Sequence, residues 1–205
     1  MQNLTVVKVD RKYIKDFIEK YHYSHSINGC ITDYCYALMS NNLMIGAMFY
    51  GRMAMRNQWR KFSDDEKKVI ELRRLVLIDE APKNTESFFI AKSLKLLSSD
   101  WRSDGVVVSY ADKEYGHSGI IYKASNFVMV GELSGAKVIN FLGKLYHDKA
   151  IRTKYKGKLK PFAKRLKDSL KSGIAVYKKT AGKFCYVYYL DSKLRELKRE
   201  SYRKL

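Results

Sequence analysis

The chain of 205 residues contains little proline and little cysteine, and it has no long apolar run. Its two prolines are Pro82 and Pro161, and no stretch rich in glycine and serine separates one part from another. The longest apolar runs, such as residues 75–78 and 105–108, have the length of a strand. They are far shorter than the roughly 18 residues of a membrane-spanning helix. We therefore expect one continuous fold and no membrane partner.

Cysteine chemistry is limited by number and spacing. The three cysteines, Cys30, Cys35 and Cys185, are odd in number and include no CxxC pair. This pattern favours reduced thiols over a disulfide framework or a zinc site. The N-terminus is charged from Lys8 onward and has no apolar segment of the kind that a secretory signal requires. We therefore expect a soluble, cytoplasmic protein.

Acidic residues are scarce, and most of all in the last third. The chain has 40 Lys and Arg against 21 Asp and Glu, a formal net charge of +19. Residues 1–143 hold 20 basic and 16 acidic side chains, a net charge of +4, whereas residues 144–205 hold 20 and 5, a net charge of +15. Such a field attracts a polyanion by releasing its counterions. Interleaved aromatic side chains could stack on bases. This favours nucleic acid as the partner; the alternatives are another anion and a surface charged only for solubility.

The hydrophobic periodicity predicts that strands and helices alternate. Asn41 and Asn42 tolerate a positive φ angle, so the apolar segments on either side of them are expected to form a hairpin. The expected strands are 4–9, 36–40, 43–50, 69–78, 105–110, 127–130, 173–177 and 184–190, the last two paired as a hairpin. Helices are expected over 11–21, 85–97, 120–125 and 192–203.

This alternation indicates an α/β fold. Residues 1–143 are expected to form the core. Residues 144–205 are expected to form a basic extension, continuous with that core, which ends in a β-hairpin and a helix and binds nucleic acid.

The first candidate site is the strand, turn and helix that begin at residue 69. A helix that opens directly after a strand presents free N–H groups and the positive end of its dipole, which suits a phosphate. Asn84, Thr85 and Ser87 lie at this helix start. Arg73 and Arg74 alternate in side along the strand, so one of them is expected to face the site. The alternative is an ordinary helix cap.

The second candidate site follows the buried strand at residues 105–110. This strand brings Ser109, Tyr110 and Asp112 to its carboxyl end, where α/β sheets usually bind ligands. Tyr122 follows in the next helix. His117 and Ser118 lie in a glycine-flanked loop before this helix. An aspartate, a histidine and a tyrosine at one rim could provide a base and a proton donor. The alternative is an unremarkable loop at a strand end.

The third candidate is the segment YHYSHS at residues 21–26. His22 and His25 could bind a metal or move protons. The alternative is a histidine pair with a structural role only.

These three segments, in this order and spacing, resemble the Mom family of phage DNA-modification proteins, which is similar to a divergent branch of the GCN5-related N-acetyltransferase (GNAT) fold. The motifs are ELRRLVLIDEAPKNTES and VSYADKEYGHSGIIYKASNF, and the match resumes at KFCYVYYLD. The resemblance implies a GNAT-like mixed central sheet flanked by helices. It also implies a transferase that converts adenine in double-stranded DNA to its N6-carbamoylmethyl derivative, which shields phage DNA from restriction in the host cytoplasm.

The resemblance also implies roles for individual residues. Asp112 is the expected base or the group that orients the adenine amine, and Tyr122 the proton donor or positioning group. His22 and Tyr23 are expected to line the adenine pocket or to bind a metal. Iron is a candidate cofactor on this ground, and the metal ligands themselves are not assigned.

An acyl-CoA-type donor, such as acetyl-CoA, is implied in the same way. Arg74 and Ser87 would hold its phosphate or carbonyl end, with Asn84 and Thr85 beside them. The GNAT pyrophosphate loop is rich in glycine, and the corresponding loop here, residues 79–87, contains none. Two other functions fit the same residues: a GNAT-type acyltransferase that acts on a modified base, RNA or protein, and a non-catalytic DNA-binding anti-restriction protein. The oligomeric state is not assigned.

Overall fold

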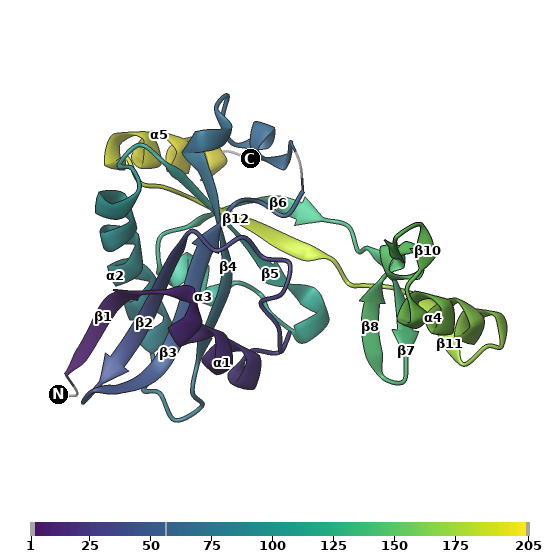
Figure 1. Cartoon of the computed structure of the whole chain (residues 1–205). Coiled ribbons are helices and arrows are strands. Elements are labelled where there is room, and N and C mark those ends of the chain that lie inside the picture. The colour runs from purple at the N-terminus through teal and green to yellow at the C-terminus, as the bar shows by residue number, and fades with distance from the viewer. Residues whose placement is uncertain (1–2, 56, 204–205) are drawn as a thin grey trace. The chain divides into compact units, whose positions relative to one another are not determined.

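The computed structural model describes residues 3–55 and 57–203, and the chain divides into two compact units. Unit 1 comprises residues 1–111, 119–131 and 185–205, and unit 2 comprises residues 112–118 and 132–184. Figure 1 labels the helices and strands of both units. Each unit is described by itself.

Unit 1 is built around a seven-stranded mixed sheet with the strand order β1-β2-β3-β4-β5-β12-β6. Neighbouring strands from β1 to β4 are antiparallel, and β4 and β5 are parallel. The strands are β1 (Leu4–Val9), β2 (Tyr34–Ser40), β3 (Leu43–Gly51), β4 (Val69–Leu77), β5 (Val106–Asp112), β6 (Val128–Leu133) and β12 (Lys183–Tyr189).

Helices cover both faces of this sheet. One face packs against α1 (Arg11–Tyr21), and the other against α2 (Thr85–Asp100). On the α2 face, the Tyr36 hydroxyl donates to a carboxylate oxygen of Asp100 at 2.9 Å. The other helical elements are α3 (Ile120–Ala124), α5 (Ser192–Arg203) and two short 3-10 helices, Gln58–Lys61 and Glu66–Lys68.

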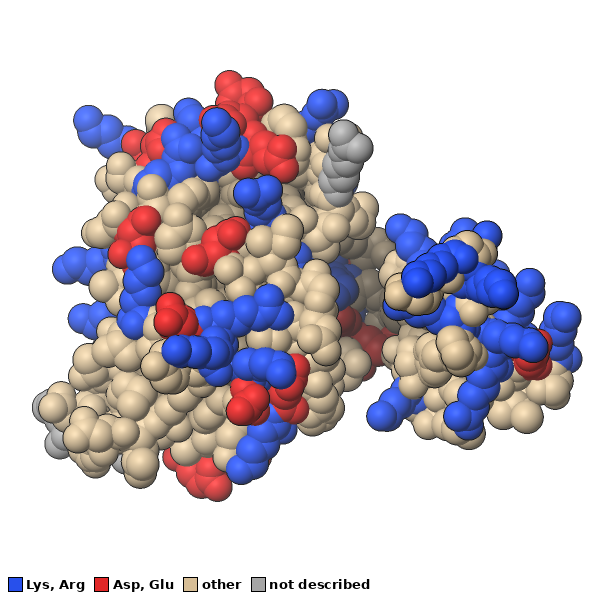
Figure 2. All heavy atoms as spheres, viewed as in Figure 1, with Lys and Arg blue, Asp and Glu red and all other residues tan. Residues whose placement is uncertain are grey.

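Unit 2 has a smaller sheet of three antiparallel strands in the order β11-β7-β8. Helix α4 packs on it through Leu166, which is buried with Ile139, Phe141 and Ala175. Lys and Arg side chains cover much of the visible surface of the unit (Figure 2, right). Its elements are β7 (Lys137–Phe141), β8 (Lys144–His147), β9 (Lys154–Tyr155), β10 (Lys158–Leu159), α4 (Pro161–Lys171), β11 (Ala175–Lys179) and the 3-10 helices Lys113–Tyr115 and Asp148–Arg152.

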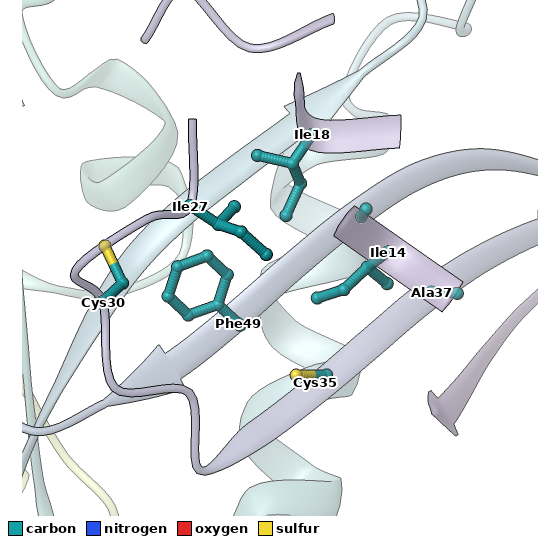
Figure 3. Packing of buried hydrophobic residues seen from close by; sticks show 8 residues of the cluster. Ile14, Ile18, Ile27, Cys30, Cys35, Ala37 and Phe49 are labelled. Carbon is teal, nitrogen blue, oxygen red and sulfur yellow. The ribbon is translucent and has the colours of Figure 1, made fainter. Parts of the chain in front are cut away.

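The core of unit 1 explains why β2 has apolar residues at successive positions. Cys35 and Ala37 share one buried cluster with Ile14 and Ile18 of α1 (Figure 3). Tyr36, which lies between them in sequence, contacts the opposite helix. Side chains alternate along a strand, so a strand that is covered on both faces carries apolar residues at successive positions.

Several expected elements form at or near the expected residues. The strand 4–9 and the helices 11–21 and 192–203 have these bounds in the structure. Asn41 and Asn42 have φ angles of 48° and 64° and join β2 to β3 as expected. The three cysteines are free and buried. In the described part of the chain, no helix combines the length and apolarity that a membrane crossing requires.

The expected hairpin of residues 173–177 and 184–190 does not form. Both segments contain strands, but β11 pairs with β7 in the small sheet, and β12 lies between β5 and β6 in the large sheet. The apolar pattern of a strand indicates that it is extended and does not indicate its partner, because pairing depends on residues far away in sequence.

The expected boundary between residues 143 and 144 lies in a hairpin turn. Leu142 and Gly143 have φ angles of 51° and 78° and connect β7 to β8, which pair with each other. Both strands therefore belong to unit 2. The closing helix α5 belongs to unit 1.

The buried cluster between α1 and the sheet provides a test of stability. Phe49 is 0% exposed in this cluster, and Leu43 on the same strand is 71% exposed. We expect Phe49→Ala to lower the free energy of unfolding by about 3–5 kcal/mol, because a large buried side chain leaves a cavity. Leu43→Ala should change it by less than about 0.5 kcal/mol. Urea unfolding followed by circular dichroism measures both, and equal effects would contradict this packing.

Candidate active site

The sheet of unit 1 opens between β4 and β5. Parallel pairing of the two strands ends at Leu72 and Ser109, although β4 continues to Leu77 and β5 to Asp112. We call the strand segments beyond this point, residues 73–77 and 110–111, the β4–β5 opening. The two strands leave backbone groups unpaired toward each other here, so an extended ligand with amide groups could hydrogen-bond between them.

A β-bulge in β4 lies where the opening begins. Phe49 of β3 is opposite Arg74, and the next residue, Tyr50, is opposite Leu72. Arg73 is therefore the extra residue of the bulge. A bulge bends its strand and strengthens the local twist, which turns β4 away from β5 beyond this point.

Both arginines of this segment have buried donors without a partner. Arg73 Nη1 donates to the Arg52 carbonyl at 2.9 Å, and Arg74 Nη1 donates to the Arg73 carbonyl at 2.7 Å. The Nε atoms of Arg73 and Arg74 are buried and have no hydrogen-bond partner among the described residues. A buried, unsatisfied donor costs about 1–3 kcal/mol. A carbonyl or phosphate oxygen of a ligand would remove this cost.

The Tyr122 hydroxyl lies beside Ser109, which with Leu72 forms the last pair of β4 and β5. It is hydrogen-bonded to Ser109, whose hydroxyl donates to the Leu72 carbonyl at 3.3 Å. Burial raises the pKa of Tyr122 above its ordinary value. Tyr122 therefore keeps its proton at neutral pH and can act as a hydrogen-bond donor.

Aromatic rings hold Tyr122 in position. Its ring centroid is 5.5 Å from that of Phe127 and 5.3 Å from that of Tyr186. Gly119, at the start of α3, has a φ angle of 78°, and a Cβ atom there would lie 2.3 Å from the Tyr186 ring. Only glycine allows α3 to begin this close to the ring, which explains the glycine that precedes the IIY motif.

A second polar group on β4, Glu71, was not among the residues expected from the sequence. The residue is 9% exposed, and its Oε2 accepts a hydrogen bond from the Ala54 amide at 3.2 Å. Its charge contributes to the raised pKa values of Tyr110 and Cys185, although burial is the larger cause in both. Arg73 Nη1 lies 3.9 Å from the same Oε2, so the buried carboxylate is paired. A single glutamate among the apolar residues at the start of the strand was the available signal, because a carboxylate is rarely buried unless it is paired.

Tyr110 and Cys185 lie beside this carboxylate. Gln58 donates to the Tyr110 hydroxyl at 2.7 Å, and Tyr110 and Cys185 are hydrogen-bonded to each other. Burial raises the pKa of the Cys185 thiol to about 11. Both groups are therefore protonated and neutral at physiological pH.

At the start of α2, an asparagine adopts a backbone conformation that usually requires glycine. Asn84 has a φ angle of 67°, in the left-handed region, so it supplies the conformation that glycine usually provides. Thr85 is buried, and the Ser87 hydroxyl donates to the Asn84 carbonyl at 2.9 Å. The first N–H groups of α2 have no acceptor within the helix, as at any helix start. These three residues therefore lie together, as expected.

Asp112 has structural contacts and belongs to unit 2. Its Oδ2 lies 2.8 Å from the Lys183 ammonium group, and its Oδ1 accepts from the Glu114 amide at 3.1 Å. The second contact caps a 3-10 helix. Tyr122 belongs to unit 1. The two residues expected to act as base and proton donor are therefore in different units.

His22 is buried and Tyr23 is partly exposed, with ring centroids 4.1 Å apart. The Ser24 amide donates to His22 Nδ1 at 3.0 Å, so Nδ1 carries no proton. His25 instead contacts the Glu19 carbonyl. In the described residues, no three His, Cys, Asp or Glu side chains are close enough to hold a metal ion. This arrangement does not fit the expected iron.

A cavity of about 1010 Å³ lies in unit 1 between the starts of β2 and β4 and the segment that follows β3. Its walls combine aromatic side chains with basic and acidic ones, among them Tyr34, Trp59, Trp101, Arg52, Lys67, Arg102, Asp33 and Glu66. Arg102 is paired with Asp104. Flat rings beside positive charges suit a planar, electron-rich group such as a nucleobase.

Comparison with known proteins gives a family and a fold. The sequence pattern of the Mom protein family matches residues 3–204. The chain is 32% identical over 96 residues to Methylcarbamoylase mom of Escherichia phage Mu. That alignment covers 46% of this chain and 40% of the phage Mu protein, so it spans two fifths of the relative's length.

Solved acetyltransferases have a similar fold. NAA60 of Arabidopsis thaliana in complex with acetyl-CoA has a TM-score of 0.53 at 11% identity, covering 91% of this chain and 98% of that one. An N-acetyltransferase from Staphylococcus aureus Mu50 has a TM-score of 0.52 at 12% identity, covering 92% and 99%. The expected fold class, a GNAT-like mixed sheet flanked by helices, is confirmed.

The buried Cys185 thiol makes stability depend on pH. Its pKa is about 11 in the folded chain, against an ordinary value of 9.0. Folding therefore favours the protonated thiol, and this contribution is present below pH 9 and lost as the pH rises toward 11. We expect the free energy of unfolding to fall over this window, with up to roughly 3 kcal/mol from this thiol.

Cys185→Ala should make that fall smaller. Val187→Ala is the matched control, because Val187 is buried in the same cluster and does not titrate. It should lower stability equally at every pH. Urea unfolding at pH 8, 9, 10 and 11 measures the slopes, and equal slopes for wild type and Cys185→Ala would contradict the raised pKa.

Proposed function

The chain belongs to the Mom protein family, and we propose that it is a transferase that adds a carbamoylmethyl-type group to N6 of adenine in double-stranded DNA. The observation that carries the proposal is the β4–β5 opening, where the buried Nε donors of Arg73 and Arg74 have no acceptor among the described residues. The name of the phage Mu relative, a methylcarbamoylase, supports the group that is transferred. Modified DNA would then resist restriction in the host cytoplasm.

We propose that the opening binds an acyl-CoA-type donor. Arg73 and Arg74 offer Nε donors to a carbonyl or phosphate oxygen, and the start of α2 at Asn84, Thr85 and Ser87 offers backbone N–H groups to a phosphate. Attack by an amine on the thioester carbonyl of such a donor forms an N–C(=O) bond and releases the CoA thiol. A carbamoylmethyl group is joined to N6 through its methylene carbon, so its formation requires in addition a second reactant that supplies the amide nitrogen. Acetyl-CoA in NAA60 of Arabidopsis, a protein of the same fold, supports this class of donor.

Tyr122 would act through its proton. Burial keeps the hydroxyl protonated, and Ser109, which donates to the Leu72 carbonyl, leaves its oxygen free to accept from Tyr122. The Tyr122 hydroxyl can turn from Ser109 to a negative charge that develops on the donor. A positioned proton donor of this kind typically contributes 10²–10⁴-fold to the rate.

Two carboxylates are candidates for orienting the adenine amine and accepting its proton. Asp112 is the candidate from the family motif, and its two oxygens are engaged by Lys183 and the Glu114 amide. Glu71 lies in the transferase unit itself, two residues before the bulge at Arg73. From this position on β4, the Glu71 carboxylate would orient the adenine amine at the β4–β5 opening.

The adenine must leave the base stack to react. Flipping a base out of a duplex costs a few kcal/mol, which stacking and phosphate contacts can offset. Two places in unit 1 offer aromatic faces: the His22–Tyr23 pair and the cavity with Tyr34, Trp59 and Trp101.

Mass spectrometry of nucleosides tests the reaction. DNA from cells that express the wild type should contain a new modified adenosine. Arg74→Gln should lose it through weaker donor binding, and Tyr122→Phe should reduce it by about 10²-fold or more. Lys95→Gln, on the exposed side of α2, is the control and should leave it unchanged. Soluble, folded wild-type protein without any new adenosine would contradict the proposal.

The same assay separates the two carboxylates. If Glu71 orients the amine, Glu71→Gln should abolish the modified adenosine while Asp112→Asn keeps a substantial part of it. If Asp112 has that role, the order reverses. The pH dependence of the modification rate is the second measurement. Loss of the base removes the fall in rate at acidic pH, whereas loss of a structural contact lowers the rate at every pH. Identical profiles for both variants would contradict either assignment.

A further inference from the structure

We propose that the β9–β10 hairpin of unit 2 enters the major groove of double-stranded DNA, with its lysines on the phosphates and Tyr155 against the base edges. The proposal rests on the proposed function in one respect, the choice of DNA as the polyanion. Every observation that supports it lies within unit 2.

Charge is the first observation. Residues 144–171 carry 11 Lys and Arg and only 2 Asp and Glu, a net charge of +9. Elsewhere in unit 2, carboxylates are held by basic partners: Asp112 by Lys183, Glu114 by Lys178 and Glu132 by Lys113. In contrast, Lys154, Lys156, Lys158 and Lys160 form no ion pair with any described residue and are exposed. Their charges are therefore available to an external polyanion.

The shape of the hairpin is the second observation. Lys154 pairs with Leu159, and Tyr155 pairs with Lys158. Lys156 and Gly157 form the two-residue turn between them, with φ angles of 47° and 78°, as in the tightest hairpins. Two paired strands lie about 4.8 Å apart. The major groove, about 12 Å wide, admits such a ribbon, whereas the minor groove, about 6 Å wide, does not.

Tyr155 is the third observation. The residue is 66% exposed on the hairpin, so its ring covers no core. The Lys156 ammonium lies 5.6 Å from the ring centroid, which adds a cation at the same tip. An exposed ring between lysines, at the end of a narrow ribbon, can contact the apolar edge of a base, such as the thymine methyl group, when the ribbon is in the groove.

The hairpin is held on a folded base. The Lys160 amide donates to the Thr153 carbonyl at 2.9 Å, and Pro161 begins α4 directly afterwards. A hollow of about 620 Å³ between the hairpin and α4 is lined by Arg152, Lys154 and Lys167, among others. Arg152 is paired with Asp148, and the other two cations, Lys154 and Lys167, suit a backbone phosphate beside the groove.

Two other polyanionic partners fit these observations less well. Insertion into the interface of an anionic membrane typically uses an amphipathic helix with a free apolar face, and α4 buries Ala163 and Leu166 in unit 2. Double-stranded RNA has a deep, narrow major groove that side chains cannot read. The hairpin therefore fits the DNA duplex.

Fluorescence anisotropy of the full-length protein with one labelled DNA duplex, over a series of salt concentrations, tests the lysines. Lys154→Gln with Lys158→Gln should reduce the slope of log K against log salt by about 1.8. Between 50 and 200 mM salt, the wild type should then lose about twelvefold more affinity than this variant. Lys92→Gln with Lys95→Gln, on the exposed side of α2, is the matched control and should keep the wild-type slope.

Tyr155→Ala should weaken DNA binding about tenfold without changing the salt slope, because it removes a contact that involves no phosphate. Tyr13→Ala is its control, since Tyr13 is 58% exposed on α1. With RNA of the same sequence, Tyr155→Ala should bind as the wild type does. Thermal unfolding should be unchanged in all these variants, whose altered side chains are exposed.

Dimethyl sulfate reads both grooves at once, because it methylates guanine N7 in the major groove and adenine N3 in the minor groove. Bound wild-type protein should protect N7, and the hairpin variants should protect it less. Protection of N3 alone would overturn the proposal, and so would hairpin variants that bind like the wild type.

Failure of this proposal and failure of the proposed function are distinguishable. Hairpin variants that bind and modify DNA like the wild type would overturn only the groove proposal. Hairpin-dependent duplex binding by a protein that forms no modified adenosine would overturn only the proposed reaction.

Discussion

The end of backbone pairing between β4 and β5, at Leu72 and Ser109, is the constraint on which the rest of the site depends. Parallel strands satisfy each other's N–H and C=O groups wherever they stay side by side. The bulge at Arg73 bends β4 at this point, and Arg73 and Arg74, whose Nε donors are buried without a partner among the described residues, are the first residues of β4 beyond the pairing. The Ser109 hydroxyl, which donates to the Leu72 carbonyl, connects the Tyr122 hydroxyl to the same place.

An opening of this kind persists only where the surrounding packing keeps the strands apart. Unit 1 has buried side chains on both faces of the sheet, with Phe49 and the α1 isoleucines on one face and the Tyr36–Asp100 hydrogen bond on the other. Protein interiors are packed nearly as densely as crystals, so they resist rearrangement. The two unsatisfied arginine donors cost a few kcal/mol in total, and this packing offsets that cost.

Polar groups that need burial and charged groups that need exposure to water lie in different units. Groups whose pKa values are raised by burial, such as Tyr122, Tyr110 and Cys185, lie in unit 1. Chemistry benefits from such an environment, because fixed donors act more strongly where water is excluded. Exposed lysines dominate residues 144–171 of unit 2, where water-accessible charge attracts a polyanion over a distance of about 8–10 Å. One surface cannot meet both requirements, since burial that strengthens a donor would neutralise a lysine.

The sequence by itself determined the local elements and the distribution of charge. The bounds of β1, α1 and α5, and the turn at Asn41 and Asn42, follow from periodicity and φ preference, which depend on neighbours along the chain. Arg74 and Tyr122 were predicted from motifs, which are also local in sequence. Only the tertiary structure decided that β11 and β12 join different sheets and that Asp112 belongs to unit 2. It also buried Glu71 and joined Gln58 to Tyr110. These facts depend on strand pairing and burial between segments far apart in sequence, which no local pattern of residues specifies.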